Sequence, residues 1–408
     1  MPNKDKNIPK RRFKEFENAD AWELRKLGEV GTVAMCRRIF KEQTSEHGEI
    51  PFYKIGTFGG PPDAFIAREL FEEFKDKYSY PNIGDILISA SGSIGRAVEF
   101  LGEDEYFQDS NIVWLKHDGK INNIFLKQFY SIVKWSGIEG STIKRLYNEN
   151  ILNTEIALPT LPEQEAIGNF FSTLDRHITL HQRKLDLLKE QKKGFLQKMF
   201  PKNGAKVPEL RFAGFADDWE ERKLSSGLRE YTDRVIVEDD KEYYQISVRN
   251  NFGGITLRGS KMGNKIGRKR QAKINLTKYP QTLIFTRQTV EQGGIGWVDK
   301  YCDGAIVTEN MPTISLDTSV FSKYFLTNLF QTRIFYKNAI LDNVEGGSAQ
   351  IAIHESKFLS STLLFPNLDE QEKIGQFFKQ LDNTITLHQR KLDLLKEQKK
   401  GFLQKMFV

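Results

Sequence analysis

The chain has 408 residues, of which 39% are hydrophobic and 12% are aromatic. This length predicts two globular units rather than one, and the apolar content excludes a mainly disordered protein. The formal charge of +6 results from 60 basic and 54 acidic residues, so net charge alone does not indicate a nucleic-acid partner.

The two cysteines, Cys36 and Cys302, are too few for a disulfide framework or a four-ligand zinc site. Free thiols are typical of a reducing cytosol. The N-terminal stretch lacks the apolar core of a secretory signal, and no run approaches the roughly 18 apolar residues of a membrane helix. We therefore expect a cytoplasmic protein with no membrane contact.

Residues 1–160 form the first predicted domain, which has a mixed α and β pattern. Apolar residues at three- and four-residue spacing predict a helix over 63–77. Short β-branched and aromatic runs predict strands at 84–89 and 111–116. The candidate DNA-binding residues of this domain, each of which is also compatible with an ordinary surface role, are Arg37, Arg38, Arg96, Lys144 and Arg145.

Residues 161–204 are predicted to form a long helix that follows the first domain. Pro162 suits the first turn, because an N–H at that position has no helical partner, and Pro201 prevents continuation beyond Phe200. Apolar residues recur at alternating steps of four and three, which is the heptad pattern of a coiled coil. The seam of this helix includes Leu174, Ile178, His181, Leu185 and Leu188.

Residues 205–366 form the second predicted domain, with strands expected at 282–286 and 312–316 and a helix expected at 321–339. The stretch 254–273 is rich in cations and contains no acid. Such a run attracts phosphates through counterion release, and arginine also pairs with guanine edges; a solvated loop is the alternative. The candidate DNA-binding residues here are Arg258, Lys261, Lys265, Arg268, Lys269, Arg270, Lys273 and Arg287.

Each domain also contains a glycine-rich turn, at 92–95 and at 293–296. Backbone N–H groups in such turns can hold a phosphate. The alternative is a tight connection between two strands, for which glycine supplies the conformational freedom.

The last region, 367–408, repeats the middle of the chain. The letters "ITLHQRKLDLLKEQKKGFLQKMF" occur at 178–200 and again at 385–407. The match extends upstream, where "LPEQEAIGNFF" corresponds to "LDEQEKIGQFF", and "DAWELRKL" near the N-terminus resembles "DDWEERKL" in the second half. The seam of the second helix therefore includes Leu381, Ile385, His388, Leu392 and Leu395.

An apolar stripe on a single helix requires a partner, because it would otherwise leave a large exposed apolar patch. The same chain offers an identical stripe. We therefore expect an α+β protein in which two similar mixed domains are separated by two long antiparallel coiled-coil helices with pseudo-two-fold symmetry. The alternative is that each helix pairs with another protein, or that two chains form a four-helix bundle.

The sequence contains no recognisable catalytic or metal-binding constellation. His181 and His388 lie in the seam, where polar residues commonly fix the register; a metal site or a pH switch is the alternative. The six histidines show no metal-ligand spacing, so no metal site is predicted. A P-loop ATPase motif is also missing.

This plan of two variable domains, each followed by a shared heptad helix that starts with "LPEQEAI" or "LDEQEKI", resembles the specificity subunit of type I restriction-modification systems. The turn "GDILISASGSIGR" and the "GST" and "GSA" before the two helices resemble that family as well. The turn "TLIFTRQTVEQGGIG" in the second half departs from the usual pattern.

The resemblance implies that each variable domain reads one half of a split, asymmetric site in double-stranded DNA. The helices would set the spacing between the halves and dock two methylation subunits. S-adenosylmethionine, ATP and Mg2+ would belong to the methylation and restriction subunits, and this chain would contribute no catalysis and carry no cofactor. The alternatives are a stand-alone DNA-modifying enzyme and a coiled-coil adaptor that never contacts DNA.

Overall fold

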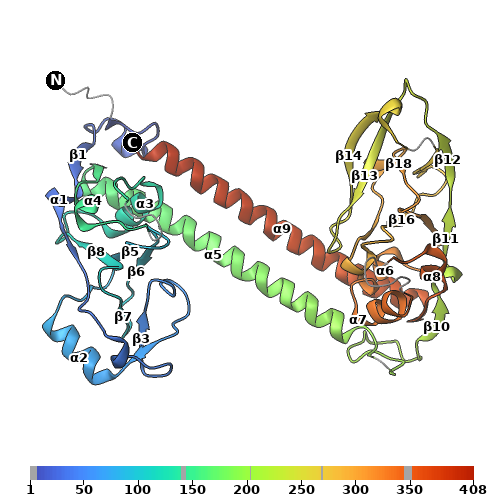
Figure 1. Cartoon of the computed structure of the whole chain (residues 1–408), viewed down its shortest axis with the longest axis horizontal. Coiled ribbons are helices and arrows are strands. Elements are labelled where there is room, and N and C mark those ends of the chain that lie inside the picture. Colours follow the sequence, from blue (N-terminus) through green and yellow to red (C-terminus); the bar gives the residue numbers. More distant parts are fainter. Residues whose placement is uncertain (1–6, 139–143, 203, 268–269, 344–351) are drawn as a thin grey trace. The chain divides into compact units, whose positions relative to one another are not determined.

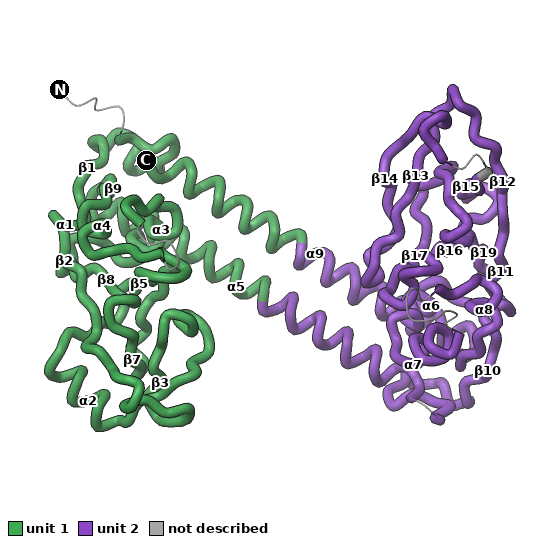
Figure 2. Tube along the Cα trace, viewed as in Figure 1, with its two compact units in different colours: residues 1–182, 390–408 green, residues 183–389 purple. Residues whose placement is uncertain are grey.

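The computed structural model describes residues 7–138, 144–202, 204–267, 270–343 and 352–408. The chain divides into two compact units (Figure 2), of which unit 1 comprises Met1–Gln182 with Arg390–Val408 and unit 2 comprises Arg183–Gln389. Both boundaries fall inside the two long helices, α5 (Leu161–Lys198) and α9 (Leu368–Met406). Each unit therefore contains a segment of both helices, whereas the sequence-based division places the helices outside the domains.

Unit 1 combines helices with three small β-sheets (Figure 1). The four-stranded antiparallel sheet has the order β2 (Thr32–Ala34), β8 (Ile112–Lys116), β5 (Ile86–Ser89) and β6 (Ala97–Glu99). The three-stranded sheet has the order β4 (Phe65–Ile66), β3 (Ile50–Tyr53) and β7 (Tyr106–Phe107), and β3 is parallel to β7. A third pair joins β1 (Glu23–Lys26) to β9 (Glu155–Leu158). The shorter helices of the unit are α1 (Leu27–Val30), α2 (Arg68–Lys77), α3 (Asn123–Ile132), α4 (Asn148–Leu152) and two 3-10 turns at Lys14–Phe16 and Lys41–Gln43.

Unit 2 repeats this plan with a larger second sheet. Its four-stranded antiparallel sheet has the order β11 (Leu228–Tyr231), β19 (Thr313–Leu316), β16 (Thr282–Phe285) and β17 (Ile295–Trp297). Its five-stranded sheet has the order β12 (Asp233–Ile236), β15 (Arg270–Lys273), β18 (Ile306–Val307), β13 (Glu242–Val248) and β14 (Ile255–Met262). The third pair joins β10 (Glu220–Lys223) to β20 (Thr362–Phe365).

The remaining elements of unit 2 are short helices. Its α-helices are α6 (Lys323–Leu329), α7 (Arg333–Phe335) and α8 (Glu355–Ser360), and a π-helical turn covers Tyr336–Ile340. Its 3-10 turns lie at Leu224–Ser226, Gly263–Lys265, Val290–Gln292, Lys300–Cys302 and Leu341–Asn343. Each unit thus contains one parallel strand pair, which is β3–β7 in unit 1 and β13–β18 in unit 2. Strands β12 and β15 have no counterpart among the described strands of unit 1. The predicted α+β class with two similar mixed domains is confirmed.

The predicted strands are all present, as β5, β8, β16 and β19, but both predicted helices inside the domains are wrong in extent. The helix expected from residue 63 begins at Arg68, because Ile66 pairs with Ile50 in β3 and is buried there. The helix expected over 321–339 is interrupted after α6, where the Thr332 hydroxyl accepts a hydrogen bond from the Phe335 N–H and caps a new helix. Local apolar spacing does not reveal either tertiary effect.

Within each unit, the segments of α5 and α9 run antiparallel and pack through equivalent aromatic pairs. In unit 1, Phe170 near the start of α5 lies edge-on to Phe402 near the end of α9, with ring centroids 5.0 Å apart. In unit 2, Phe195 near the end of α5 meets Phe377 near the start of α9 in the same way, also at 5.0 Å. The predicted antiparallel pairing of the two repeated helices within one chain is therefore found inside each unit.

Ion pairs flank these aromatic contacts at equivalent positions. Lys399 Nζ lies 2.6 Å from Asp175 Oδ1 in unit 1, and Lys192 Nζ lies 2.7 Å from Asp382 Oδ1 in unit 2. Both lysines occupy seam positions of the heptad pattern. A cation at a seam position is costly unless it finds such a partner, so these pairs restrict the register of the helices.

The side chains at the seam positions are buried or half-buried, whereas most of the residues between them are exposed. Leu174, Leu185, Leu188, Leu392 and Leu395 are buried. The other seam residues are half-buried, namely Ile178, His181, Leu381, Ile385 and His388.

The glutamine in the "PEQ" and "DEQ" motifs holds the start of each long helix against a neighbouring helix. Gln164 Oε1 accepts a hydrogen bond from Asn122 N, at the N-terminus of α3, and Gln164 Nε2 donates to Pro159 O. Gln371 Oε1 likewise accepts from Ser322 N, at the N-terminus of α6, and Gln371 Nε2 donates to Pro366 O. An N–H at a helix N-terminus lacks a partner within its helix, so the glutamine satisfies a group that burial would otherwise make costly.

The glutamate of the same motifs forms a buried, two-pronged ion pair in each unit. Glu163 accepts from Arg12 Nε at 2.8 Å and from Arg12 Nη2 at 2.5 Å. Glu370 accepts from Arg211 Nε and Nη2, both at 2.7 Å. The hydrogen bonds that Arg211 donates to Glu370 raise the pKa of Arg211 above its ordinary value. These pairs attach the segment that precedes β1 or β10 to the long helix of the same unit.

The C-terminal end of a long helix completes the core of each unit. In unit 1, Phe407 stacks on Phe125 at 5.1 Å and lies edge-on to Trp22 at 6.2 Å. In unit 2, Phe200 packs against Phe325 at 5.3 Å and Trp219 at 6.1 Å. The end of α9 therefore serves unit 1 as the end of α5 serves unit 2.

The glycines of the repeated helix differ in what surrounds them, and this difference gives a testable prediction. A Cβ at Gly375 would lie 2.8 Å from the backbone N of Phe325, whereas no described atom lies within 4 Å of a Cβ at Gly194. We expect Gly375→Ala to lower the free energy of unfolding by about 1–3 kcal/mol through overpacking. Gly194→Ala should raise it by roughly 0.5–1 kcal/mol, since alanine favours helix.

Urea denaturation of the two variants measures both effects on the same unit. An equal rise in stability in both variants would show that the close approach of Phe325 does not require a glycine at position 375.

Candidate nucleic-acid interface

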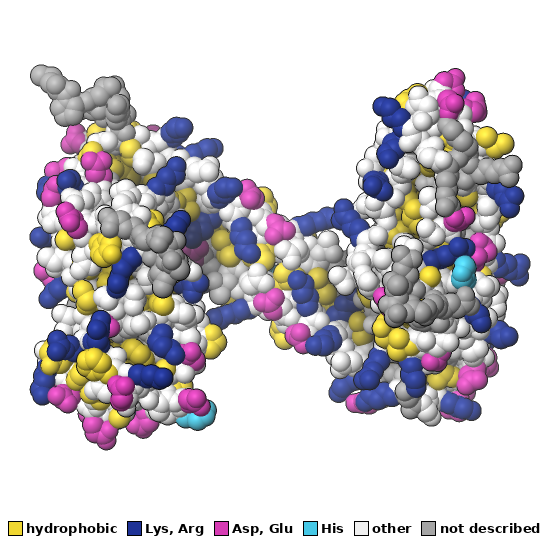
Figure 3. All heavy atoms as spheres, viewed as in Figure 1, with side chains coloured by type: hydrophobic (Ala, Val, Ile, Leu, Met, Phe, Trp, Pro, Cys, Tyr) yellow, Lys and Arg dark blue, Asp and Glu magenta, His cyan; other side chains and the backbone are white. Residues whose placement is uncertain are grey.

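The cationic stretch predicted in the second domain forms an exposed edge of the five-stranded sheet. Arg258 and Lys261 lie on β14, the last strand of that sheet, and Lys265 lies in the turn that follows. All three are exposed, and no ion pair joins them to the described part of the chain. In the space-filling view, Lys and Arg side chains follow the side of unit 2 where β14 lies (Figure 3).

The other members of that stretch are placed differently. Lys273 is half-buried on β15 and opposes Asp233 across the sheet. Arg270 begins β15, while its side chain, Arg268 and Lys269 lie outside the described residues. The structure thus groups Arg258, Lys261 and Lys265 on one edge. Lysines on an exposed edge strand also prevent that strand from pairing with other chains. The arrangement therefore agrees both with DNA binding and with protection of the sheet edge.

Replacing Arg258, Lys261 and Lys265 together by alanine is expected to weaken DNA binding. Each lost phosphate contact should reduce the slope of log K against log salt by about 0.9. The measurement is binding to a fixed duplex across a salt series. A matched control removes three exposed lysines of the same unit that pair with acids, Lys198, Lys202 and Lys241. An equal loss in both triple variants would mean that the β14 edge has no specific role.

The glycine-rich turns are tight strand connections. In unit 1 the turn joins β5 to β6, and Gly95 N donates to Ser89 O. In unit 2 the turn joins β16 to β17, with Gly293 N and Gly294 N bonded to Val290 O and Thr289 O. These N–H groups are already used within the turns, so the geometry favours a strand connection over a phosphate cradle.

The unusual turn of the second domain carries the tip of the β13–β14 hairpin. Asn251 N donates to Gln292 O, and Phe252 N donates to Gly293 O. Both Asn251 and Phe252 have positive φ angles, of 54° and 56°. A left-handed conformation is strained for phenylalanine, and these hydrogen bonds hold the tip in place. The departure from the family-like turn pattern therefore coincides with a docked hairpin.

Three predicted DNA-binding arginines have partners within the protein. Arg287 donates from Nε and Nη2 to Glu355 Oε2, and 18% of its side chain is exposed. Arg145 donates to Ser110 Oγ at 2.9 Å, and Arg96 donates to Phe58 O at 2.6 Å. Arg287 in particular is committed to a structural ion pair. Lys144 is exposed.

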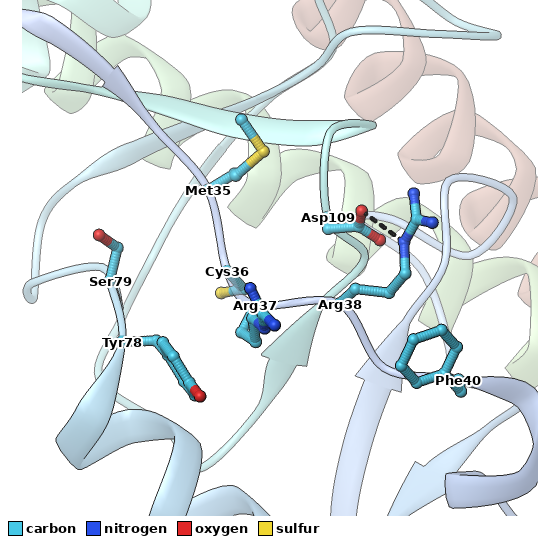
Figure 4. Close-up of a pocket in the computed structure, with 8 residues that line it drawn as sticks. All are labelled: Met35, Cys36, Arg37, Arg38, Phe40, Tyr78, Ser79 and Asp109. Carbon is cyan, nitrogen blue, oxygen red and sulfur yellow. Dashed lines mark hydrogen bonds and ion pairs between the residues drawn. The ribbon is translucent and has the colours of Figure 1, made fainter.

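The remaining two, Arg37 and Arg38, line an open cavity of about 510 Å3 in unit 1 (Figure 4). The Arg37 guanidinium lies over the Tyr78 ring, 5.2 Å from its centroid. Arg38 Nε donates to Asp109 Oδ2 at 3.0 Å, and the figure shows the two side chains directed toward each other. The cavity is lined by Met35, Cys36, Arg37, Arg38, Phe40, Tyr78, Ser79 and Asp109.

Sequence reasoning identified the arginines but missed Tyr78 and Asp109, which lie far from them along the chain. The cavity does not suit nucleophilic chemistry, because burial raises the pKa of Cys36 to about 12 and keeps it a thiol at neutral pH. Cation and aromatic groups at an exposed rim are instead typical of a surface that binds nucleic acid.

The described residues show neither a metal cluster nor a membrane-spanning helix. No group of three or more His, Cys, Asp or Glu side chains in the described ranges is arranged to hold a metal ion. No helix in the part of the chain that the structure describes combines the length and apolarity needed to cross a membrane.

The chain matches a known family model twice. The model for the type I restriction modification DNA specificity domain matches residues 19–190 and 217–397. A putative type I restriction enzyme specificity subunit of Haemophilus influenzae is 57% identical over 157 residues, which cover 38% of this chain and 41% of that protein. The MjaVIII specificity subunit of Methanocaldococcus jannaschii is 23% identical over 338 residues, which cover 79% of this chain and 75% of that protein.

Solved structures show the same fold. The crystal structure of an S subunit of a type I restriction-modification system from M. genitalium matches with a TM-score of 0.62 and 14% identity. The match covers 98% of this chain and 99% of that one. At this identity the likeness extends to the fold alone.

Proposed function

We propose that this chain, which belongs to the family of the type I restriction modification DNA specificity domain, is the DNA-recognition subunit of a type I restriction-modification complex. The observation that carries the proposal is the double match, which places one copy of the family domain on each of two units with the same frame. The sheets are arranged alike, but the surfaces differ: strands β12 and β15 of unit 2 have no counterpart among the described strands of unit 1, and unit 2 has the cationic β14 edge. Each unit therefore reads a different half of an asymmetric site.

In this proposal, α5 and α9 determine how many base pairs lie unread between the two halves. Each is one continuous helix, of 38 and 39 residues respectively. A helix advances 1.5 Å per residue and is stiff over this length. Continuous helices with a paired seam are suited to fix a distance, whereas a flexible linker would allow several gap lengths.

The same helices dock two copies of a methylation subunit. Leu180 and Leu187 lie seven residues apart on α5, outside the seam, and each is more than half exposed, at 54% and 51%. Leu387 and Leu394 occupy the identical positions on α9, at 67% and 51%. Exposed apolar residues at heptad spacing suit an amphipathic helix of a partner. The two leucine pairs occupy identical positions of the repeat, so each accepts one copy of the same subunit, and restriction subunits join the complete complex.

The chemistry is assigned to those partners, which would bind S-adenosylmethionine, ATP and Mg2+. The test is adenine methylation of genomic DNA with S-adenosylmethionine, in the presence and absence of the methylation subunits. We expect methyl transfer at a defined sequence only when both proteins are present. Methyl transfer by the purified chain alone would instead support a stand-alone enzyme. Failure to retain DNA at any salt concentration would support a protein-only adaptor.

A further inference from the structure

We propose that Arg38 reads a guanine base in the half-site bound by unit 1, with Asp109 as the residue that positions it. This inference rests on the proposed function, because it assumes that unit 1 binds a specific DNA sequence. It extends that function by assigning a direct base contact, and a base type, to one side chain.

The ion pair between Arg38 and Asp109 fixes only one edge of the guanidinium. Nε donates to Asp109 Oδ2, and neither Nη1 nor Nη2 of Arg38 has a hydrogen-bond partner among the described residues. The Arg38 side chain is 60% exposed, whereas Asp109 is only 18% exposed. A recessed carboxylate therefore holds an exposed guanidinium with its outer N–H groups directed to solvent.

This geometry matches the chemistry of guanine recognition. A guanine presents two acceptors, N7 and O6, on its major-groove edge, and arginine satisfies both with two parallel N–H groups. That contact depends on the orientation of the planar fork. A contact to phosphate fixes register without reading sequence, and a loosely held cation would serve for it. The ion pair with Asp109 orients the guanidinium, so it favours a base contact over a phosphate contact more than the positive charge alone does.

The surroundings of Arg38 favour a base-reading position at the rim of the cavity. Arg37 is stacked on Tyr78, and Phe40 is 59% exposed beside the two arginines. Asp109 is the one carboxylate among the lining residues, and it is already paired. The cavity thus presents two cations and two aromatic rings, which suits a polyanion with flat bases.

Three other arginine–carboxylate pairs among the described residues are built differently. In the pairs Arg12–Glu163, Arg211–Glu370 and Arg287–Glu355, the carboxylate engages both Nε and Nη2, and each pair is largely buried. The side chains of those three arginines are only 5%, 14% and 18% exposed, so a base cannot approach them as it can approach Arg38. Arg38, in contrast, is exposed, and Asp109 engages only its Nε among the described residues.

The experiment compares Arg38→Lys and Arg38→Ala with the full chain, assembled with its methylation subunits. Lysine retains the cation but cannot form the two parallel hydrogen bonds. We expect both variants to lose about 10- to 100-fold in preference for one G·C pair in one half-site. Sequencing of methylated sites and competition between duplexes measure this preference. Asp109→Asn should give a smaller loss at the same base pair, because the amide holds the guanidinium less firmly.

The matched control is Arg25→Ala, which removes an arginine of unit 1 that is 39% exposed and pairs with Glu23 on β1. It should leave the preference at every position unchanged. A thermal melt of each variant checks that unit 1 remains folded.

Two outcomes would overturn the inference, and they can be distinguished from each other. If Arg38→Lys keeps full discrimination, or if Arg38→Ala weakens binding equally for all sequences, Arg38 is a phosphate contact and not a base reader. If the unaltered chain with its partners methylates no defined sequence, the proposed function fails, and the assignment of Arg38 fails with it.

Discussion

Removal of one heptad from both long helices is expected to shorten the unread gap in the DNA site by about three base pairs and to leave the letters of both half-sites unchanged. The deletion takes out the identical stretches 184–190 and 391–397. Seven residues correspond to about 10 Å of helix, and one base pair occupies 3.4 Å of the duplex. Because the heptad repeat is preserved, the seam residues on either side of each deletion remain in phase.

The control for this experiment is a deletion of five residues from both helices. Five residues correspond to about 1.4 helical turns, so the seam residues on the two sides of each deletion would face different sides of the helix, and the complex should lose specific methylation altogether. Sequencing of methylated sites distinguishes these results. A heptad deletion that keeps the original gap but changes the half-site letters would refute the role of the helices in spacing.

Glu370→Ala is expected to lower the free energy of unfolding of unit 2 by about 3–5 kcal/mol, because it leaves a largely buried guanidinium without its partner. Glu370 is 0% exposed, and Arg211 is 14% exposed. The two hydrogen bonds from Arg211 to Glu370 are both 2.7 Å long. The segment that carries Arg211 would then lose its attachment to the start of α9. Urea denaturation followed by tryptophan fluorescence measures the loss, since Trp219 lies in the same core.

Glu372→Ala is the matched control, because this residue lies on the same turn of α9 and is exposed. It should change stability by less than about 0.5 kcal/mol. A loss below about 1 kcal/mol for Glu370→Ala would place this pair among ordinary surface ion pairs. The glutamate that both repeats share would then have no stabilising role in the attachment of the long helices.

The two long helices and the central strands of both units could be predicted, because the sequence patterns that indicate them are local and occur twice. The heptad spacing and the identical second copy led to two paired helices, and each unit contains one antiparallel segment pair. The strands at β5, β8, β16 and β19 were recognisable from short β-branched runs. The helix expected from residue 63 was wrong because Phe65 and Ile66 pair with β3. The spacing of apolar residues along one helix face does not show that a residue pairs with a strand elsewhere in the chain.

The candidate interface was less predictable, because charge in a sequence does not reveal the partner of each cation. Arg287 was grouped with the DNA-binding candidates, yet Glu355 engages it 68 residues away. Arg38 had no distinguishing feature in the sequence, and its partner Asp109 lies 71 residues away. The glutamates of the repeated motif find Arg12 and Arg211 at separations of 151 and 159 residues. Only the folded units show which of these cations are committed to an acidic partner.

A map of methylated adenines, in cells that express this chain together with its methylation subunits, tests most directly whether two unlike units read one split site. We expect a recognition sequence in two parts, with different letters in each part and a fixed number of unspecified base pairs between them. A single uninterrupted recognition sequence would contradict the division of reading between the two units.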